Sequence, residues 1–236
     1  MLNYQMVEEE NIFSEGQILL INKPLEWTSF DVVKKIRNLV RTKKVGHAGT
    51  LDPLATGLLV VCTGKFTKRV NEFMAQEKEY TGSFTLGAVT PTYDLESQPK
   101  NFKQFDHLSE NTIKASAKKF IGEIKQIPPM HSAIKIAGRP VYTLARKGVE
   151  VHLEPRLINI KEFEITKVEL PVVEFKVVCS TGTYIRSLAN DFGEALGVGA
   201  HLSCLCRTRI GSFSLGEAKT IREMETWIRS QMHQNG

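Results

Sequence analysis

Apolar residues follow two different spacings in the N-terminal part of the chain, which predicts strands and helices in turn. Ile18 to Ile21 is a short apolar run typical of a buried strand. Thr28, with Asp31 three residues later, is typical of a helix N-terminus. The apolar residues that follow recur at helical spacing: Val32, Val33, Ile36, Leu39 and Val40. We therefore expect a strand, a helix that begins at Thr28, and a second strand over Leu58 to Cys62.

The same two patterns continue to the C-terminus. Further helices are expected around Phe66 to Met74, over Ser109 to Ile121 with its end at Gly122, over Tyr184 to Leu196 with its end at Gly197, and after Thr220. Further strands are expected over Tyr80 to Gly87, Ile158 to Leu170, Val172 to Cys179 and His201 to Ile210. Strands that recur unevenly between helices, with a hairpin-like pair among them, favour an α+β fold. Its central sheet would be mixed or antiparallel and flanked by helices.

The segment from Ile124 to Arg156 fits neither pattern. Prolines, a glycine and basic residues recur through it. Apolar residues that can be buried, among them Ile134, Val141 and Leu144, argue against disorder. We expect an ordered loop excursion, and long excursions in a compact domain are usually functional.

Composition limits the class of protein. The chain has 236 residues, enough for one large domain or two small ones, and no apolar run approaches the length of a membrane span. Met1 to Glu15 carries acidic residues where a signal peptide would be basic and then apolar, so we expect a cytoplasmic protein. The four cysteines, Cys62, Cys179, Cys204 and Cys206, fit reduced thiols. A zinc site at His201, Cys204 and Cys206 is disfavoured, because Cys-x-Cys is not a usual zinc spacing.

Positive charge is concentrated in one stretch. The net charge is +5, and between Val32 and Leu51 there are basic residues but no acidic ones. The basic residues are Lys34, Lys35, Arg37, Arg41, Lys43 and Lys44. A solvated helix face gives the same pattern, but so does a surface that binds phosphates. The stretch runs directly into the Asp52 loop, which favours RNA as the partner.

Asp52 lies in a loop of small residues, GHAGTLDPLATGLL. A residue before proline adopts extended backbone, and the nearby glycines let the main chain approach a ligand closely. The carboxylate is therefore presented rather than packed. An isolated Asp-Pro pair would be interpreted as a turn that leads into the strand at Leu58.

This run resembles the catalytic motif of the pseudouridine synthases, in the form that acts on the T-loop uridine at position 55 of tRNA. Lys78-Glu79-Tyr80 and the GTYIR stretch that contains Arg186 resemble two further motifs of the family, in the same order. QIPPMHSAIK, which begins at Gln126, resembles the thumb that grips the RNA hairpin. The chain departs from the family at His131, where a tyrosine is expected, and at Pro91, where an aspartate is expected.

The resemblance implies the role of each site residue. Asp52 would attack the nucleoside, at C1′ or at C6 of the base, and no cofactor or metal would take part. Tyr80 would lie against the base, and Arg186 would pair with Asp52 and with a second carboxylate, Asp94. Further substrate contacts are implied for a wider set: His47, which would fill the space of the flipped base, Leu205, which would wall its pocket, and Tyr184, Lys23, Lys43 and Lys44.

The resemblance also implies a domain organisation. The catalytic domain would span 16–230, with the thumb at 124–156 and a flexible tail at 1–15. Too few residues follow Phe213 for the PUA domain of longer family members, so we expect the chain to bind only the T arm of tRNA. We also expect a monomer. Two alternatives stay open. A non-catalytic RNA-binding or RNA-folding module would lack Asp52, Tyr80 or Arg186, and an enzyme for another uridine would lack the T-loop features, His47 and the thumb.

Overall fold

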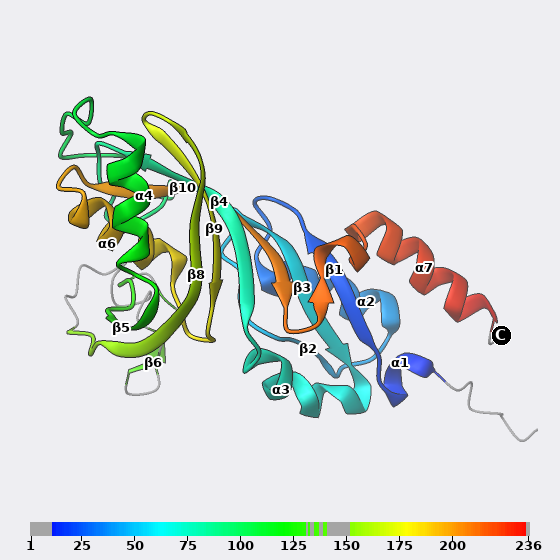
Figure 1. Ribbon diagram of the computed structural model, residues 1–236. Helices are drawn as coiled ribbons and strands as arrows, with labels where there is room; N and C mark the ends of the chain where they lie inside the picture. Colours follow the sequence, from blue (N-terminus) through cyan, green and yellow to red (C-terminus); the bar gives the residue numbers. More distant parts are fainter. Residues whose placement is uncertain (1–10, 131, 133–134, 137–138, 141–151, 235–236) are drawn as a thin grey trace, which may run out of the picture. The chain divides into compact units, whose positions relative to one another are not determined.

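The computed structural model describes residues 11–130, 132, 135–136, 139–140 and 152–234. The chain forms two compact units, which divide the predicted domain 16–230. Unit 1 comprises the described parts of Met1–Gln76 and Arg207–Gly236, and unit 2 comprises those of Glu77–Cys206. One strand, β10 (Ala200–Ile210), contributes residues to both units (Figure 1).

Unit 1 is built on antiparallel strands. β1 (Ile18–Lys23) pairs with β3 (Ala55–Thr63), with Ile18 opposite Cys62, and the strand order is β1-β3-β10. β2 (Val45–His47) also pairs with β3, and β11 (Phe213–Ser214) pairs with β10. The strands predicted at Ile18 to Ile21 and at Leu58 to Cys62 are confirmed, each within a longer strand.

Both faces of β3 are buried, because side chains alternate across a strand. Leu59 and Val61 pack with residues of α2 (Ser29–Val40) and α7 (Ile221–Gln234). Leu58 and Val60 pack on the other face with Phe73 of α3 (Val70–Met74), which follows the 3₁₀ helix η1 (Gly64–Arg69). A second short 3₁₀ helix, η2 (Leu215–Glu217), precedes α7.

The predicted start of the first long helix is confirmed. Thr28 is the N-cap of α2: its hydroxyl accepts from Asp31 N at 3.0 Å, and the Asp31 carboxylate accepts from Thr28 N at 2.9 Å. This reciprocal pair satisfies two main-chain donors that a helix end otherwise leaves unpaired.

The predicted flexible tail at 1–15 is wrong for its last residues. Asn11 caps a one-turn helix, α1 (Ile12–Glu15), and its side-chain amide donates to Val40 O at 2.9 Å. Phe13 is fully buried and meets the edge of the Trp227 ring. One large aromatic side chain thus anchors the segment despite its acidic neighbours. Residues 1–10 lie outside the described part of the chain.

Unit 2 has the strand order β10-β4-β9-β8-β5, with antiparallel pairing from β4 to β5. The strands are β4 (Lys78–Leu86), β5 (Gly122–Gln126), β8 (Arg156–Glu169) and β9 (Val172–Cys179). Two helices, α4 (Glu110–Lys118) and α6 (Ile185–Ala195), belong to this unit (Figure 1). An isolated parallel bridge joins Asp94 to Leu202. The predicted α+β class, with a mixed sheet flanked by helices, is confirmed.

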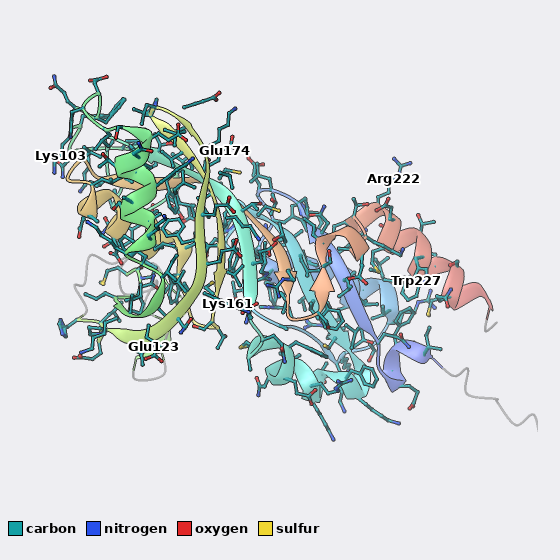
Figure 2. All side chains as sticks on the ribbon, in the orientation of Figure 1. Lys103, Glu123, Lys161, Glu174, Arg222 and Trp227 are labelled. Atoms are coloured by element: carbon teal, nitrogen blue, oxygen red, sulfur yellow. The ribbon has the colours of Figure 1, made fainter. Side chains whose placement is uncertain are left out.

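Aromatic rings fill the core of unit 2. Phe84 stacks on Phe175, with ring centroids 4.2 Å apart, and Phe163 and Phe192 meet them edge-on or tilted. The outward positions of β8 and β9 alternate with these and carry charged side chains, such as Lys161 and Glu174 (Figure 2). The prediction for α4 needs a correction: the helix ends at Lys118, and Gly122, with φ +105°, begins β5 instead of terminating the helix.

The predicted thumb at 124–156 is described only in part. Two-residue strands, β6 (Lys135–Ile136) and β7 (Arg139–Pro140), pair with each other, and His131 lies outside the described residues. All four cysteines are free thiols; Cys62 and Cys179 are buried, whereas Cys204 is exposed. Among the described residues, none of the helices has the length and apolar character needed to cross a bilayer.

Candidate functional site

The Asp52 loop lies between β2 and β3 in unit 1 and is fastened to the start of α2. The Ser29 hydroxyl accepts from Leu51 N at 2.9 Å and donates to Leu51 O at 3.2 Å. Pro53 O accepts from Glu26 N at 2.9 Å. Asp52 itself is half-buried, and its carbonyl accepts from Ala55 N at 3.1 Å. The residues on both sides of Asp52 are therefore held by the segment that leads into α2.

The buried side chain of Lys23 also holds the Asp52 loop to the segment that leads into α2. Its side chain is fully buried, and Nζ donates to the main-chain oxygens of Trp27 at 2.5 Å, Pro24 at 2.9 Å and Pro53 at 3.4 Å. Burial lowers the pKa of Lys23 to about 8, against the opposing attraction of the nearby Asp52 carboxylate. The Lys23 ammonium thus donates its hydrogen bonds to main-chain oxygens of the protein itself. The predicted contact of Lys23 with RNA stays a prediction.

A second buried cation, Arg207, contacts both ends of the loop. Nε donates to Leu58 O at 2.8 Å and Nη2 donates to Gly49 O at 3.0 Å. Arg207 is not among the predicted site residues, although an arginine inside a largely apolar strand pattern is an available signal. His47 ends β2 and is partly buried; burial, followed by the positive charge of Arg207, lowers its pKa. Both effects favour the neutral form of the His47 imidazole.

Arg186 is buried in the first turn of α6, in unit 2. Its Nε lies 3.6 Å from Asp94 Oδ2, and Nη1 donates to Thr92 O at 3.3 Å. Both side chains of the Arg186–Asp94 pair are only 5% exposed. The predicted contact between Arg186 and Asp94 is confirmed. Asp52 belongs to the other unit, and its pairing with Arg186 stays a prediction.

Hydroxyl groups fix the loop that carries Asp94. Asp94 O accepts from Thr90 Oγ1 at 2.7 Å and from Thr92 Oγ1 at 3.2 Å. Thr92 Oγ1 also lies 2.7 Å from Ser97 Oγ, within hydrogen-bond distance. The departure at Pro91 leaves this network in place, because the contacts come from the residues on either side.

Three more predicted residues lie in unit 2. Tyr80, on β4, and Leu205, on β10, are both buried. Tyr184 is half-buried at the start of α6, where the Gln126 amide bonds its main chain on both sides: Tyr184 N donates to Oε1 at 2.8 Å and Nε2 donates to Tyr184 O at 3.1 Å. Lys43 and Lys44, in unit 1, are exposed between α2 and β2.

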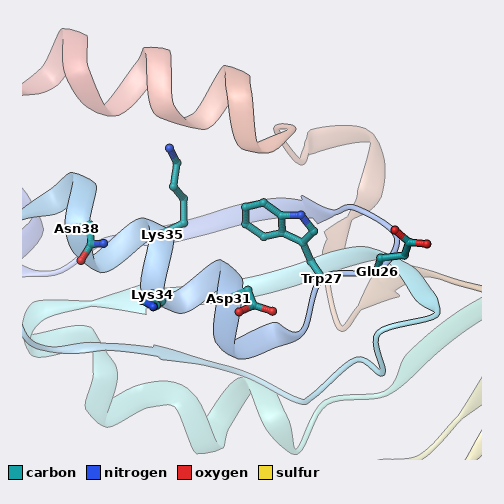
Figure 3. A pocket seen from close by; sticks show the side chains of 6 residues that line it. All are labelled: Glu26, Trp27, Asp31, Lys34, Lys35 and Asn38. Carbon is teal, nitrogen blue, oxygen red and sulfur yellow. The ribbon is translucent and has the colours of Figure 1, made fainter. Parts of the chain in front are cut away.

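A surface hollow of about 460 Å³ lies along the exposed side of α2 in unit 1 (Figure 3). Its lining residues are Glu26, Trp27, Asp31, Lys34, Lys35 and Asn38. Lys35 is paired with Glu225 of α7 at 2.6 Å, and the Asp31 carboxylate is used in the helix cap. The lining contains two lysines and two carboxylates, so the hollow carries no net charge.

Family models and related proteins match almost the whole chain. A family model described as TruB family pseudouridylate synthase (N terminal domain) matches residues 37–185, and one described as tRNA pseudouridylate synthase B C-terminal domain matches 186–235. A tRNA pseudouridine synthase B of Flavobacterium johnsoniae is 51% identical over 93% of this chain and 98% of its own length. That of Bacteroides fragilis is 49% identical over 93% of this chain and 97% of its own.

Solved structures agree with the sequence comparisons. A chain in the crystal structure of a Cbf5-Nop10-Gar1 complex matches with a TM-score of 0.74 and 30% identity over 97% of this chain. A chain of an H/ACA RNP bound to a substrate RNA that contains 2′-deoxyuridine matches with a TM-score of 0.70 and 29% identity. This chain spans 59% and 57% of the length of these two solved chains. The family models and the curated relatives show that the chain belongs to the TruB family of pseudouridylate synthases.

Proposed function

We propose that the chain isomerises uridine to pseudouridine at position 55 in the T loop of tRNA. Family membership supports the reaction, and the names of the curated relatives support tRNA as the substrate. The observation that carries the proposal is the Asp52 loop. It holds one carboxylate at partial exposure, while the Ser29 hydroxyl accepts from Leu51 N and the Lys23 ammonium donates to Pro53 O, on the two sides of Asp52.

The proposed reaction begins with attack by the Asp52 carboxylate on the nucleoside, at C1′ or at C6 of the base. A carboxylate is already an anion at neutral pH and needs no general base to act as a nucleophile. If attack is at C1′, the N1–C1′ bond breaks as the bond from Asp52 to C1′ forms; the uracil then turns, and C5 bonds to C1′ as the bond to Asp52 breaks. If attack is at C6, the N1–C1′ bond of the adduct breaks, the uracil turns, C5 bonds to C1′, and the bond from Asp52 to C6 breaks last. The proton lost from C5 balances the proton gained at N1, so the product is an isomer of the substrate.

Arg186 and Tyr80 are assigned to the same step. The planar guanidinium of Arg186 can make two parallel hydrogen bonds to a carboxylate, which fixes direction as well as charge. Its contacts to Asp94 and to Thr92 O hold the guanidinium plane, which supports this role. Tyr80 is assigned to hold the uracil ring and to help move the proton at C5.

Access to the target base requires that it leave the stack of the T loop, at a cost of a few kcal/mol. We assign His47 to occupy the vacated space. A neutral imidazole suits this role because it carries no charge into the stack. Lys43 and Lys44 are exposed and are assigned to the phosphates of the T arm.

We further propose that the chain works as a monomer in the cytoplasm, with no cofactor or metal. The proposed reaction involves no redox change and no phosphoryl transfer, and Asp52 supplies its nucleophile, which supports the last point. We expect activity to survive dialysis against a chelator. We also expect sedimentation to give the mass of a single chain.

Tritium release tests the proposed function directly. A T-arm hairpin with tritium at C5 of uridine 55 loses the label to water if that uridine is isomerised. A matched hairpin that carries the label at a neighbouring uridine serves as the control. We expect release from the first hairpin alone. Release from the second alone would show the same chemistry on another uridine, and binding without release would show an RNA-binding module.

A further inference from the structure

Arg207 stands out among the buried charged side chains of unit 1. It is 1% exposed, and it is the bulkiest of the fully buried side chains in the described residues. Removing an arginine from water is costly unless its donors are satisfied. Here the donors serve main-chain oxygens: Nε bonds Leu58 O at 2.8 Å and Nη2 bonds Gly49 O at 3.0 Å.

The two acceptors lie on either side of Asp52 in the chain. Gly49 follows β2 at the start of the loop, and Leu58 lies on β3 after the loop. One rigid side chain therefore joins the two ends of the segment that presents the carboxylate. The planar guanidinium has donors in a fixed geometry, which sets the separation of the two carbonyls as well as their attachment.

Gly49 is matched to this contact. Its φ is +94°, a conformation that favours glycine, and a Cβ built there would lie 3.5 Å from Arg207 Nη1. The glycine thus permits the turn of the backbone, and a Cβ at this position would make only ordinary van der Waals contact with the guanidinium. The same charge acts on His47, whose pKa is lowered first by burial and then by the charge of Arg207.

We propose that Arg207 is a positioning residue, which sets the direction of the Asp52 carboxylate by fixing both ends of its loop. The proposal rests on the proposed function, because it concerns the rate of the step that Asp52 starts. Arg207 acts through Gly49 and Leu58. Its loss should therefore slow the chemical step while RNA binding is kept. A residue that only stabilised unit 1 would change neither quantity in a variant that stays folded.

The test compares R207M with R207K and with a control, R209M, in the full chain. Arg209 lies two residues further along β10 and donates Nη1 to Gly211 O at 2.9 Å, outside the Asp52 loop. The measurements are single-turnover tritium release from the T-arm hairpin, the Kd for that hairpin, and the His47 pKa by NMR. Far-UV circular dichroism and cooperative melting establish that each variant is folded.

We expect R207M to release tritium about 30-fold more slowly, since small misplacements of a reacting group cost up to about 100-fold, with the Kd changed less than about threefold. The His47 pKa should rise because a nearby positive charge is gone. R207K should keep the His47 pKa low because the positive charge remains. It should recover only part of the rate, because one ammonium cannot donate to both carbonyls in the geometry of the planar, forked guanidinium. R209M should resemble the unaltered chain in all three measurements.

Several results would overturn the inference. One is a folded R207M with an unchanged rate; another is a rate loss matched by an equal loss of RNA affinity. If R207M does not fold, R207K decides: a full rate with lysine at this position excludes positioning by the fork. A chain of unaltered sequence that releases no tritium overturns the proposed function and this inference with it. If the unaltered chain releases tritium normally, and R207M and R207K release it at the same rate, only this inference is overturned.

Discussion

The Asp52 loop in unit 1 and the Asp94 loop in unit 2 are both held through main-chain carbonyls, but by different donors. Buried cations, Lys23 and Arg207, bond the carbonyls around Asp52. Neutral hydroxyls, from Thr90 and Thr92, bond the carbonyl of Asp94. A carboxylate assigned to attack thus lies among positive charges. A carboxylate assigned to hold an arginine lies among dipoles, which leaves the arginine as its main cationic partner.

The comparison predicts that the two regions respond differently to substitution. Loss of a cation removes charge and geometry together, and charge-assisted hydrogen bonds are roughly twice as strong as neutral ones. Loss of a hydroxyl removes one neutral hydrogen bond, worth about 1 kcal/mol. Substitutions around Asp52 should therefore have the larger effects.

The largest effect is expected for D52N. The amide keeps the shape of the side chain but is no nucleophile, so tritium release should fall more than about 100-fold while RNA affinity stays within a few fold. Single-turnover release and a binding titration with the same hairpin measure the two quantities. Residual turnover above about one per cent in a purified sample would contradict the assignment of the nucleophile.

R186K should be the next most damaging change. A lysine keeps the charge but cannot make the two-pronged contact of a guanidinium, so we expect a loss of about 30-fold in rate with folding retained. The D52N/R186K double variant sharpens this prediction. If the two residues serve one step, the double variant should be no slower than D52N alone. Additive losses would mean that Arg186 acts elsewhere.

T92V tests the neutral region. Valine keeps the shape of threonine but loses the hydroxyl that reaches Asp94 O and Ser97, so the Arg186 contact should loosen and the rate fall by about fivefold. T92S should restore the rate. S203A is a matched control, because it removes a hydroxyl of the same unit that donates to Ser83 O at 3.0 Å. Equal losses in T92V and S203A would show a general effect on unit 2.

The local spacing of apolar and polar residues predicted the helices and strands well, but it does not show which charged side chains are buried. The Thr28 cap and the hairpin of β8 and β9 follow from spacing and turn residues alone. Arg207 and Arg209 occupy equivalent positions in an alternating strand pattern, and only the fold makes one fully buried. The family resemblance supplied the contact between Asp94 and Arg186. Phe13 was missed because the acidic residues around it are typical of a solvated tail.

K43Q/K44Q should change binding alone. Each lysine that neutralises a phosphate adds about one unit to the slope of log affinity against log salt, so the pair should flatten that slope by up to about two units. The choice of uridine should not change, since phosphate contacts carry no sequence information. Titrations at several salt concentrations measure the slope. An unaltered slope would remove these lysines from the RNA-binding surface.

The smallest effect concerns pH, to which one buried group in each unit responds in an opposite direction. Burial raises the pKa of Asp191, on α6, to about 6, whereas burial lowers that of Lys23 to about 8. A folded state that holds the Asp191 proton more tightly than the unfolded chain loses stability as pH rises from about 4 to 6. Lys23 acts in the opposite direction at higher pH: it adds stability as pH rises from about 8 to 10. At neutral pH both side chains are ionised and each lowers stability, and the Asp191 carboxylate contributes one such penalty.

D191N removes that penalty. At pH 8 the variant should be more stable by about 1 kcal/mol, after allowance for solvent screening, which corresponds to about 2–4 °C in Tm. At pH 5 the gain should be smaller, because the wild-type carboxyl is then largely protonated in the folded state. D106N, at an exposed carboxylate of unit 2, is the matched control and should leave Tm unchanged at both pH values. Thermal melts at pH 5 and pH 8 provide the measurement. An equal gain at the two pH values would point to packing around α6 as the cause, since only a titrating charge makes the difference depend on pH.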